Sequence, residues 1–160
     1  MRGCLPHPFV PCRAKVGLFL EHNQLSGKLP TDATFYAEHL ARSLRQLELD
    51  SNALTGPVPA ALGALVLLET CHLGSNLLSG YLPPGLGDGW LNVVSFDLAN
   101  NRNFDGAGLA GPIPASVESL ACRMATENAT VCNLDGNGFA EDDCLNSPCA
   151  AAKCVACGDV

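Results

Sequence analysis

The sequence predicts an α/β right-handed solenoid, in which stacked coils of the chain each add one strand to a parallel sheet on the concave side. Three observations favour this fold. A pattern of alternating apolar residues followed by asparagine occurs five times in the 160 residues. The two most regular intervals, from Asn52 to Asn76 and from Asn76 to Asn101, are 24 and 25 residues. One such unit cannot bury its leucines alone, whereas stacked units can.

The best copy of the pattern, Leu47–Pro59, has the form Leu-x-Leu-x-x-Asn-x-Leu-x-Gly-x-Val-Pro. Leu47 and Leu49 alternate with polar residues, as expected for a short strand with one buried face. The asparagine follows where the chain turns away from the strand and leaves backbone groups without ladder partners. Its amide offers a donor and an acceptor to those groups, which predicts an asparagine ladder through the array. The expected ladder residues are Asn23, Asn52, Asn76, Asn101 and Asn137.

The segments between strands predict short helices and extended connections. Glycine and proline near the end of each copy suit an irregular return path. Helical turns are expected at 60–65 and 115–120, and a fuller short helix at 37–44 within the first insertion. Longer intervals predict two more insertions, at 103–108 and near 122–130. Such insertions fall on loops and are more often tolerated surface length than functional sites.

Composition limits the possible function classes. The net charge of -7 argues against nucleic acids and anionic membranes as partners, because phosphate binding requires a basic surface. No apolar run approaches the roughly 18 residues of a membrane span. Residues 1–6 lack the apolar core of a signal peptide, so we expect the chain to be a fragment of a longer protein.

The nine cysteines indicate an oxidising compartment, and their placement predicts disulfide-capped ends. Cys71 alone lies in the middle of the array, where it is expected to be a free, buried thiol. A disulfide loop is expected between Cys4 and Cys12. The tail could also hold half a zinc site at Cys154 and Cys157, or the opening of an epidermal-growth-factor-like module. The expected disulfide cysteines are Cys4, Cys12, Cys122, Cys132, Cys144, Cys149, Cys154 and Cys157.

The five copies resemble a leucine-rich repeat array. The consensus Leu-x-x-Asn-x-Leu-Ser/Thr-Gly-x-Leu/Val/Ile-Pro resembles the plant-type extracellular subfamily, which includes receptor-like kinase ectodomains and polygalacturonase-inhibiting proteins. Cys4 and Cys12 resemble part of that subfamily's N-terminal cap, and the copy at 132–139 with the cysteines after it resembles its C-terminal cap. The implied division is a cap remnant at 1–15, repeats at 16–139 and a Cys-rich cap at 140–160.

The exposed positions of the repeats should line the concave face. Of these twelve positions, four are acidic, two are histidine and none is lysine or arginine. They are Phe19, Glu21, His22, Glu48, Asp50, Ser51, His72, Gly74, Ser75, Asp97, Ala99 and Asn100. Glu48, His72 and Asp97 should form one lateral row, since parallel strands lie about 4.8 Å apart. Such a row could bind a metal or act in acid–base chemistry, but a solvated polar face is the preferred interpretation.

We therefore expect a non-catalytic recognition module that binds a protein or peptide ligand outside the cell or at its surface, and the acidic face favours a basic ligand. No enzyme activity, metal or cofactor is predicted. Two alternatives stay open: an inhibitor of a secreted cell-wall-degrading hydrolase, and a ligand-binding fragment of a receptor-like kinase. Asn128 lies in the one glycosylation sequon and is a candidate acceptor.

Overall fold

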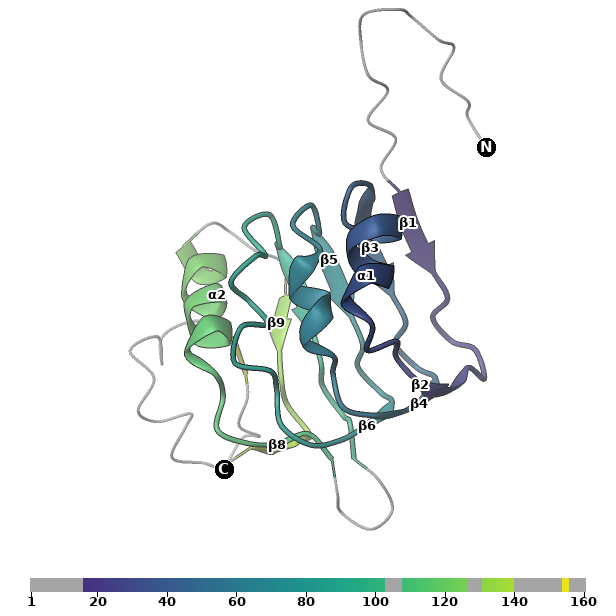
Figure 1. The fold of residues 1–160 in the computed structure, drawn as a ribbon. Coiled ribbons are helices and arrows are strands. Elements are labelled where there is room, and N and C mark those ends of the chain that lie inside the picture. Colours follow the sequence, from purple (N-terminus) through teal and green to yellow (C-terminus); the bar gives the residue numbers. More distant parts are fainter. Residues whose placement is uncertain (1–15, 103–107, 127–130, 140–153, 156–160) are drawn as a thin grey trace, which may run out of the picture.

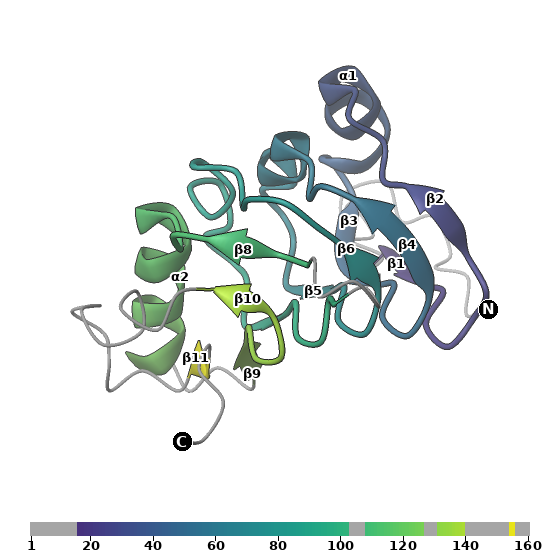
Figure 2. The ribbon, with the colours of Figure 1, turned by 90° about the horizontal axis from the view of Figure 1, so that it is seen from below.

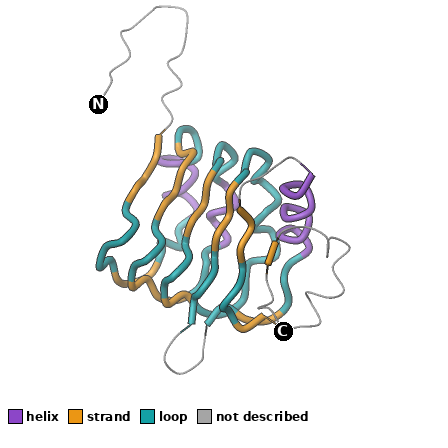
Figure 3. Tube along the Cα trace, turned by 180° about the vertical axis from the view of Figure 1, so that it is seen from behind, coloured by secondary structure: helices purple, strands orange, loops and turns teal. Residues whose placement is uncertain are grey.

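The computed structural model describes residues 16–102, 108–126, 131–139 and 154–155, and these form a curved solenoid (Figure 1). A six-stranded parallel sheet lies along one side, with strand order β1-β3-β5-β7-β9-β11. Its strands are β1 Val16–Phe19, β3 Leu44–Glu48, β5 Thr70–His72, β7 Ser95–Asp97, β9 Val131–Asn133 and β11 Cys154–Val155. Figure 3 shows this sheet with the helices on the opposite side of the molecule. The predicted leucine-rich repeat solenoid with a parallel sheet is confirmed.

The strand register repeats from coil to coil. Leu18, Leu47, Cys71, Phe96 and Cys132 are successive register partners. Of these, Leu47, Cys71, Phe96 and Cys132 are buried, whereas Leu18 in the first coil is 37% exposed. The sixth strand, Cys154–Val155, pairs with β9 and lies in the segment that the sequence assigns to a cap rather than to a repeat.

The return path contains additional short strands. One small parallel sheet is formed by β2 Ser26–Lys28, β4 Ala53–Gly56 and β6 Leu77–Leu78, and another by β8 Ala110–Gly111 and β10 Gly138–Phe139. These strands lie along the lower edge of the solenoid in Figure 1, and Figure 2 shows them from below. The repeated glycines permit this path because they adopt positive φ angles, for example 79° at Gly56 and 88° at Gly80.

Helical segments occupy the convex side. They are α1 Ala33–Phe35, the π-helix η1 Tyr36–Leu40, the 3-10 helix η2 Ala60–Ala64 and α2 Ala115–Thr126. The helix expected at 37–44 was misplaced, because helical structure begins at Ala33 and Leu44 already belongs to β3. Asp32 explains the earlier start: its side chain accepts a hydrogen bond from the Thr34 backbone N–H at 2.8 Å.

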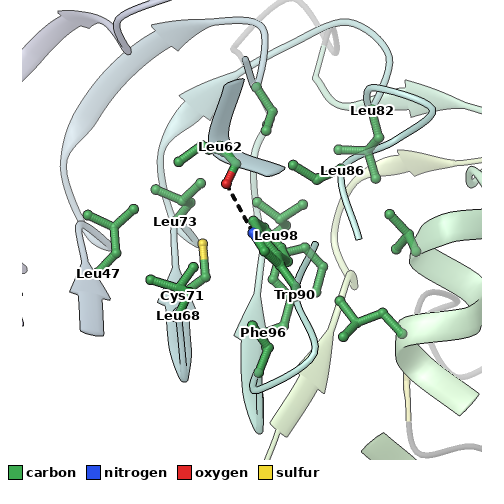
Figure 4. Packing of buried hydrophobic residues seen from close by; sticks show 14 of the residues in the cluster. Leu47, Leu62, Leu68, Cys71, Leu73, Leu82, Leu86, Trp90, Phe96 and Leu98 are labelled. Carbon is green, nitrogen blue, oxygen red and sulfur yellow. Dashed lines mark hydrogen bonds between the residues drawn. The ribbon is translucent and has the colours of Figure 1, made fainter. Parts of the chain in front are cut away.

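The core is mainly aliphatic, with Trp90 and Phe96 packed edge to face at a centroid distance of 5.3 Å (Figure 4). Trp90 is fully buried, and its Nε1 donates to the Leu62 carbonyl oxygen at 3.0 Å in the preceding coil. Cys71 packs among these residues as a free thiol. Burial raises the pKa of this thiol, and so keeps it neutral.

The asparagines at the strand ends bond between coils. Asn76 Nδ2 donates to the Leu49 carbonyl oxygen at 3.0 Å, and Asn76 Oδ1 accepts from the Leu54 N–H at 3.0 Å. Asn52, Asn101 and Asn137 likewise donate to a leucine carbonyl of the coil before, namely Leu20, Leu73 and Leu98. Asn23, in the first coil, is exposed and donates to the carbonyls of Leu20 and Glu21 within its own coil.

Two of the end cysteines, Cys122 and Cys132, are disulfide-bonded. The pairing of the end cysteines stays a prediction. Most of the two predicted caps lies outside the described residues, namely 1–15 and 140–153. The same holds for the candidates Cys4, Cys12, Cys144, Cys149, Cys157 and Asn128. Within the described part of the chain, no helix has the length and apolar character needed to cross a membrane.

Candidate functional site

The concave face is built from residues in register across the sheet. Phe19, Glu48, His72, Asp97 and Asn133 are successive partners in β1, β3, β5, β7 and β9. Glu48, His72 and Asp97 are each partly exposed, and Phe19 is 57% exposed at the end of the row. The repeat spacing therefore places these three polar side chains on adjacent strands.

Glu48 and His72 of this row form a hydrogen-bonded network with Ser95, which lies two residues before Asp97 in β7. His72 Nδ1 lies 2.5 Å from Glu48 Oε2, and His72 Nε2 lies 2.7 Å from Ser95 Oγ. The side chains of Glu48 and His72 are 15% and 26% exposed, whereas Ser95 is 6% exposed. The imidazole is thus fixed through both ring nitrogens by groups from the strands on either side of it.

The Glu48 carboxyl has a raised pKa. Burial is the largest cause, because it penalises the charged carboxylate, and the negative charges of Asp50 and Glu21 act in the same direction. His72 opposes this shift through its charge and its hydrogen bond. The site therefore holds a proton on or near the Glu48–His72 pair more strongly than an exposed glutamate would.

The Asp97 carboxylate has a different hydrogen-bond partner from His72, so the predicted row does not form a Glu–His–Asp site. Its Oδ1 accepts the backbone N–H of Ala99 at 2.7 Å, and the carboxylate lies over Gly74 of the preceding coil. Asp50 follows β3, so it lies in the coil on the other side of Gly74 from Asp97. Its Oδ2 accepts a hydrogen bond from the Ser51 hydroxyl at 3.3 Å. Lateral register alone does not bring the Asp97 carboxylate to His72.

Four candidate positions lie in turns just beyond the strands. His22, Ser51, Ser75 and Asn100 have φ angles between 51° and 57°, the left-handed region, immediately before the ladder asparagines. Their backbone N–H groups still donate across the array, as from Ser75 to the Ala99 carbonyl at 2.7 Å. These side chains form a polar edge beside the strand rows, and Glu21 is exposed next to it.

Ser95, Asn133 and Asp135 were missed by sequence reasoning. Asn133 and Asp135 hold in the fifth copy the positions that Asp97 and Ala99 hold in the fourth, so the repeat pattern could have identified them. Ser95 comes before the consensus, and nothing in the pattern indicates that its hydroxyl meets His72.

The order of carboxylate, imidazole and hydroxyl in the network is that of a nucleophilic triad. A triad also needs free donors to stabilise an oxyanion. The N–H groups of Val94 and Ser95 both donate to the Glu69 carbonyl, at 2.9 Å and 3.3 Å. Ser95 is also 6% exposed, so these two N–H groups do not form an oxyanion hole and the hydroxyl has little access to a substrate.

Among the residues that the structure describes, one group of side chains on this face could hold a cation. Ligand atoms of Glu48, Asp50 and His72 all lie within 4.8 Å of one another. One imidazole nitrogen and two carboxylates suit a divalent ion such as zinc. Because His72 Nδ1 already contacts Glu48, a metal would have to replace that contact.

Comparison with known proteins shows which family this chain resembles. The leucine-rich repeat family model matches residues 43–65. The receptor protein kinase WSS1 of Oryza sativa subsp. japonica is 34% identical over 106 residues, 66% of this chain and 9% of that protein. The LRR receptor-like serine/threonine-protein kinase GSO2 of Arabidopsis thaliana is 40% identical over 77 residues, 47% of this chain and 6% of that protein. These matches support a plant-type leucine-rich repeat family. The chain spans less than a tenth of either relative.

Solved structures of plant leucine-rich repeat ectodomains resemble this leucine-rich repeat chain. The BIR2 ectodomain of Arabidopsis thaliana gives a TM-score of 0.58 at 27% identity, covering 77% of this chain and 55% of that one. The ectodomain of GASSHO1/SCHENGEN3 from Arabidopsis thaliana, in complex with CASPARIAN STRIP INTEGRITY FACTOR 2, gives 0.59 at 29%, covering 77% and 13%. The HAESA ectodomain with a peptide hormone ligand gives 0.51 at 31%, covering 73% and 18%.

Proposed function

We propose that this chain is a non-catalytic recognition module of an extracellular or cell-surface protein, which binds a peptide or protein segment on its concave face. The observation that carries the proposal is the ordered, acidic surface of the sheet. A rigid sheet presents its side chains in fixed rows, so a matching ligand meets little ordering cost. The resemblance of this chain to the ectodomains of GASSHO1/SCHENGEN3 and HAESA, whose structures contain a bound ligand, supports the same function.

The charge of the face indicates a basic ligand. Glu21, Glu48, Asp50 and Asp97 lie on neighbouring coils. Arg45, in strand β3, has its guanidinium 2.9 Å from the Glu69 carboxylate, and this ion pair offsets its positive charge. An acidic surface of this kind accelerates the encounter with a cationic partner and binds it more weakly as salt increases.

The test is selection of peptides from a random library on the immobilised protein, followed by measurement of their dissociation constants. We expect the selected peptides to be enriched in lysine and arginine. The double substitution Glu21→Lys and Asp50→Lys should weaken their binding by about tenfold or more at low ionic strength. Both side chains are at least partly exposed, and neither bonds to the Glu48–His72–Ser95 network.

The matched control is Glu38→Lys with Asp88→Lys. This pair makes the same change in net charge on the convex side, where Glu38 lies in η1 and Asp88 in the loop after β6. Binding by the control should stay within about twofold of the wild type, since distant exposed charges are screened. Equal losses in the two double variants, or selected peptides without a basic bias, would refute a basic ligand on the concave face.

A further inference from the structure

Phe19 is apolar at a position of the concave face where the next four strands carry polar residues. Its successive register partners are Glu48, His72, Asp97 and Asn133. The repeat accounts for apolar residues at the alternate positions, such as Leu18, which is the register partner of the buried Leu47. Phe19 is instead 57% exposed, so packing in the core does not account for its ring.

The ring of Phe19 lies over Gly17, two residues earlier in β1. Side chains two residues apart in a strand point to the same face, and a Cβ at Gly17 would collide with the ring atoms Cε2 and Cζ. The glycine therefore leaves open the space that the ring occupies. The ring covers the strand at this point, and the remainder of it faces the solvent on the concave side.

Three carboxylates lie beside this ring. Glu48 is the lateral neighbour of Phe19 on β3, at the strand spacing of about 4.8 Å. Glu21 follows Phe19 by two residues, and Asp50 follows Glu48 by two. The His22 N–H donates to the Asp50 carbonyl at 3.1 Å, so the two coils stay side by side beyond the strands. Glu21 and Asp50 both act electrostatically on the Glu48 carboxylate, which indicates that the three charges are close together.

Two of these carboxylates are available to a ligand. Glu48 is engaged with His72, whose Nδ1 lies 2.5 Å from the Glu48 Oε2. Glu21 is exposed and Asp50 is partly exposed, and neither pairs with a basic side chain in the part of the chain that the structure describes. An exposed ring next to two such carboxylates suits a side chain that combines apolar surface with a positive charge.

Arginine fits this combination better than lysine does. Its planar guanidinium stacks on an aromatic face, donates to carboxylates through a fixed fork of N–H groups and is weakly hydrated. The lysine ammonium is compact and strongly hydrated, so it gains less when it leaves water to contact a ring. The apolar stem of arginine can also cover part of the ring while the charged end reaches the carboxylates.

We propose that Phe19, with Glu21 and Asp50 beside it, is a subsite for one arginine side chain of the ligand. The guanidinium stacks on the Phe19 ring, and its N–H groups donate to the two carboxylates. This inference rests on the proposed function and adds a specificity to it. The acidic face attracts any basic peptide, whereas the ring makes binding of arginine stronger than binding of lysine.

The experiment compares the dissociation constants of fluorescent nonaarginine and nonalysine peptides, which carry the same charge and differ in their cationic groups. We expect nonaarginine to bind the wild-type protein more tightly. Phe19→Leu should weaken nonaarginine binding about fivefold, as expected for one cation–π contact at an exposed site, and nonalysine binding by less than about twofold. Phe19→Trp should keep the preference for nonaarginine, because the indole ring is the better partner of a cation.

Phe35→Leu is the matched control for the loss of an exposed ring. Phe35 is 39% exposed in α1 on the convex side, where its ring contacts Tyr36 and His39. This substitution also leaves the net charge unchanged, and the preference for nonaarginine should stay as in the wild type.

The outcomes separate the subsite from the proposed function. Equal affinity of the wild type for the two peptides, equal weakening of both by Phe19→Leu, or the same loss of preference in Phe35→Leu would overturn the arginine subsite. A basic ligand on the concave face would still stand in each of these cases. If neither peptide binds the wild type, the proposed function is refuted, and the subsite with it.

Discussion

Asn76→Ala is the substitution that tests the asparagine ladder most directly. Asn76 is 3% exposed, and its amide makes four contacts: Oδ1 accepts from the Leu54 N–H, and Nδ2 lies near the carbonyls of Leu49, Leu73 and Gly74. The three carbonyls keep other donors after the substitution. Asn52 donates to Leu49, Asn101 donates to Leu73, and the Ser51 N–H donates to Gly74.

The expected cost therefore comes mainly from one buried group, the Leu54 N–H. A buried donor without a partner costs about 1–3 kcal/mol, and we expect the free energy of unfolding to fall by about that amount. The measurement is urea unfolding followed by the fluorescence of Trp90, the one tryptophan of the chain, which is fully buried in the core.

Asn92→Ala is the control for this measurement. Asn92 is exposed, and its Nδ2 donates to the Val66 carbonyl at 2.9 Å, so it loses an amide and a hydrogen bond without leaving a buried group unpaired. Its cost should stay below about 1 kcal/mol. If Asn76→Ala costs no more than Asn92→Ala, the ladder does not stabilise the array through buried backbone groups.

Three further predictions concern the core, the coil contacts and pH. Thiol labelling of the unfolded, unreduced protein should tag Cys71 alone; mass spectrometry showing several tagged cysteines would contradict this. Gly89→Ala should cost about 1–3 kcal/mol in urea unfolding, because its Cβ would meet the Gly63 carbonyl, whereas Gly85→Ala at an exposed position should cost about 0.5 kcal/mol or less. Burial raises the pKa of Glu48 above 4.5, so the folded state binds that proton more tightly than the unfolded state. The free energy of unfolding should therefore fall as the pH rises through and above this value, and Glu48→Gln should lack that part of the fall.

The repeat pattern predicted the sheet because it fixes two things at once. One is the alternation of buried and exposed residues along a strand, and the other is the number of residues between successive strands. From Asn52 to Asn101 the spacing is nearly constant, so the lateral neighbours Glu48, His72 and Asp97 follow directly. The same reasoning could not place the helix before β3. There, the position is decided by the Asp32 side chain at the helix start, a local hydrogen bond outside the repeat.

Side-chain partners within the candidate site were less predictable than its backbone positions. Asp97 and Glu48 hold equivalent positions, yet Asp97 bonds to the Ala99 N–H and Glu48 bonds to His72. The hydrogen-bond partner of each carboxylate depends on the residues of the neighbouring coil. Gly74 leaves room for the Asp97 carboxylate, and Ser95 holds the imidazole of His72 through its second ring nitrogen. The sixth strand, Cys154–Val155, could not be predicted either, because it carries no copy of the pattern.

From Asn52 onward, each ladder asparagine bonds to the coil before it, and this has a consequence for how such a chain can grow in length. Adding or removing one whole coil leaves every buried donor and acceptor with an equivalent partner, so the length can change in steps of one coil. Extra residues that do not make a coil must leave the array and return at the same point. In the fourth copy, the residues that flank the insertion lie together: Arg102 and Gly108 form a bridge, and the Leu109 N–H donates to the Asn101 carbonyl at 3.3 Å.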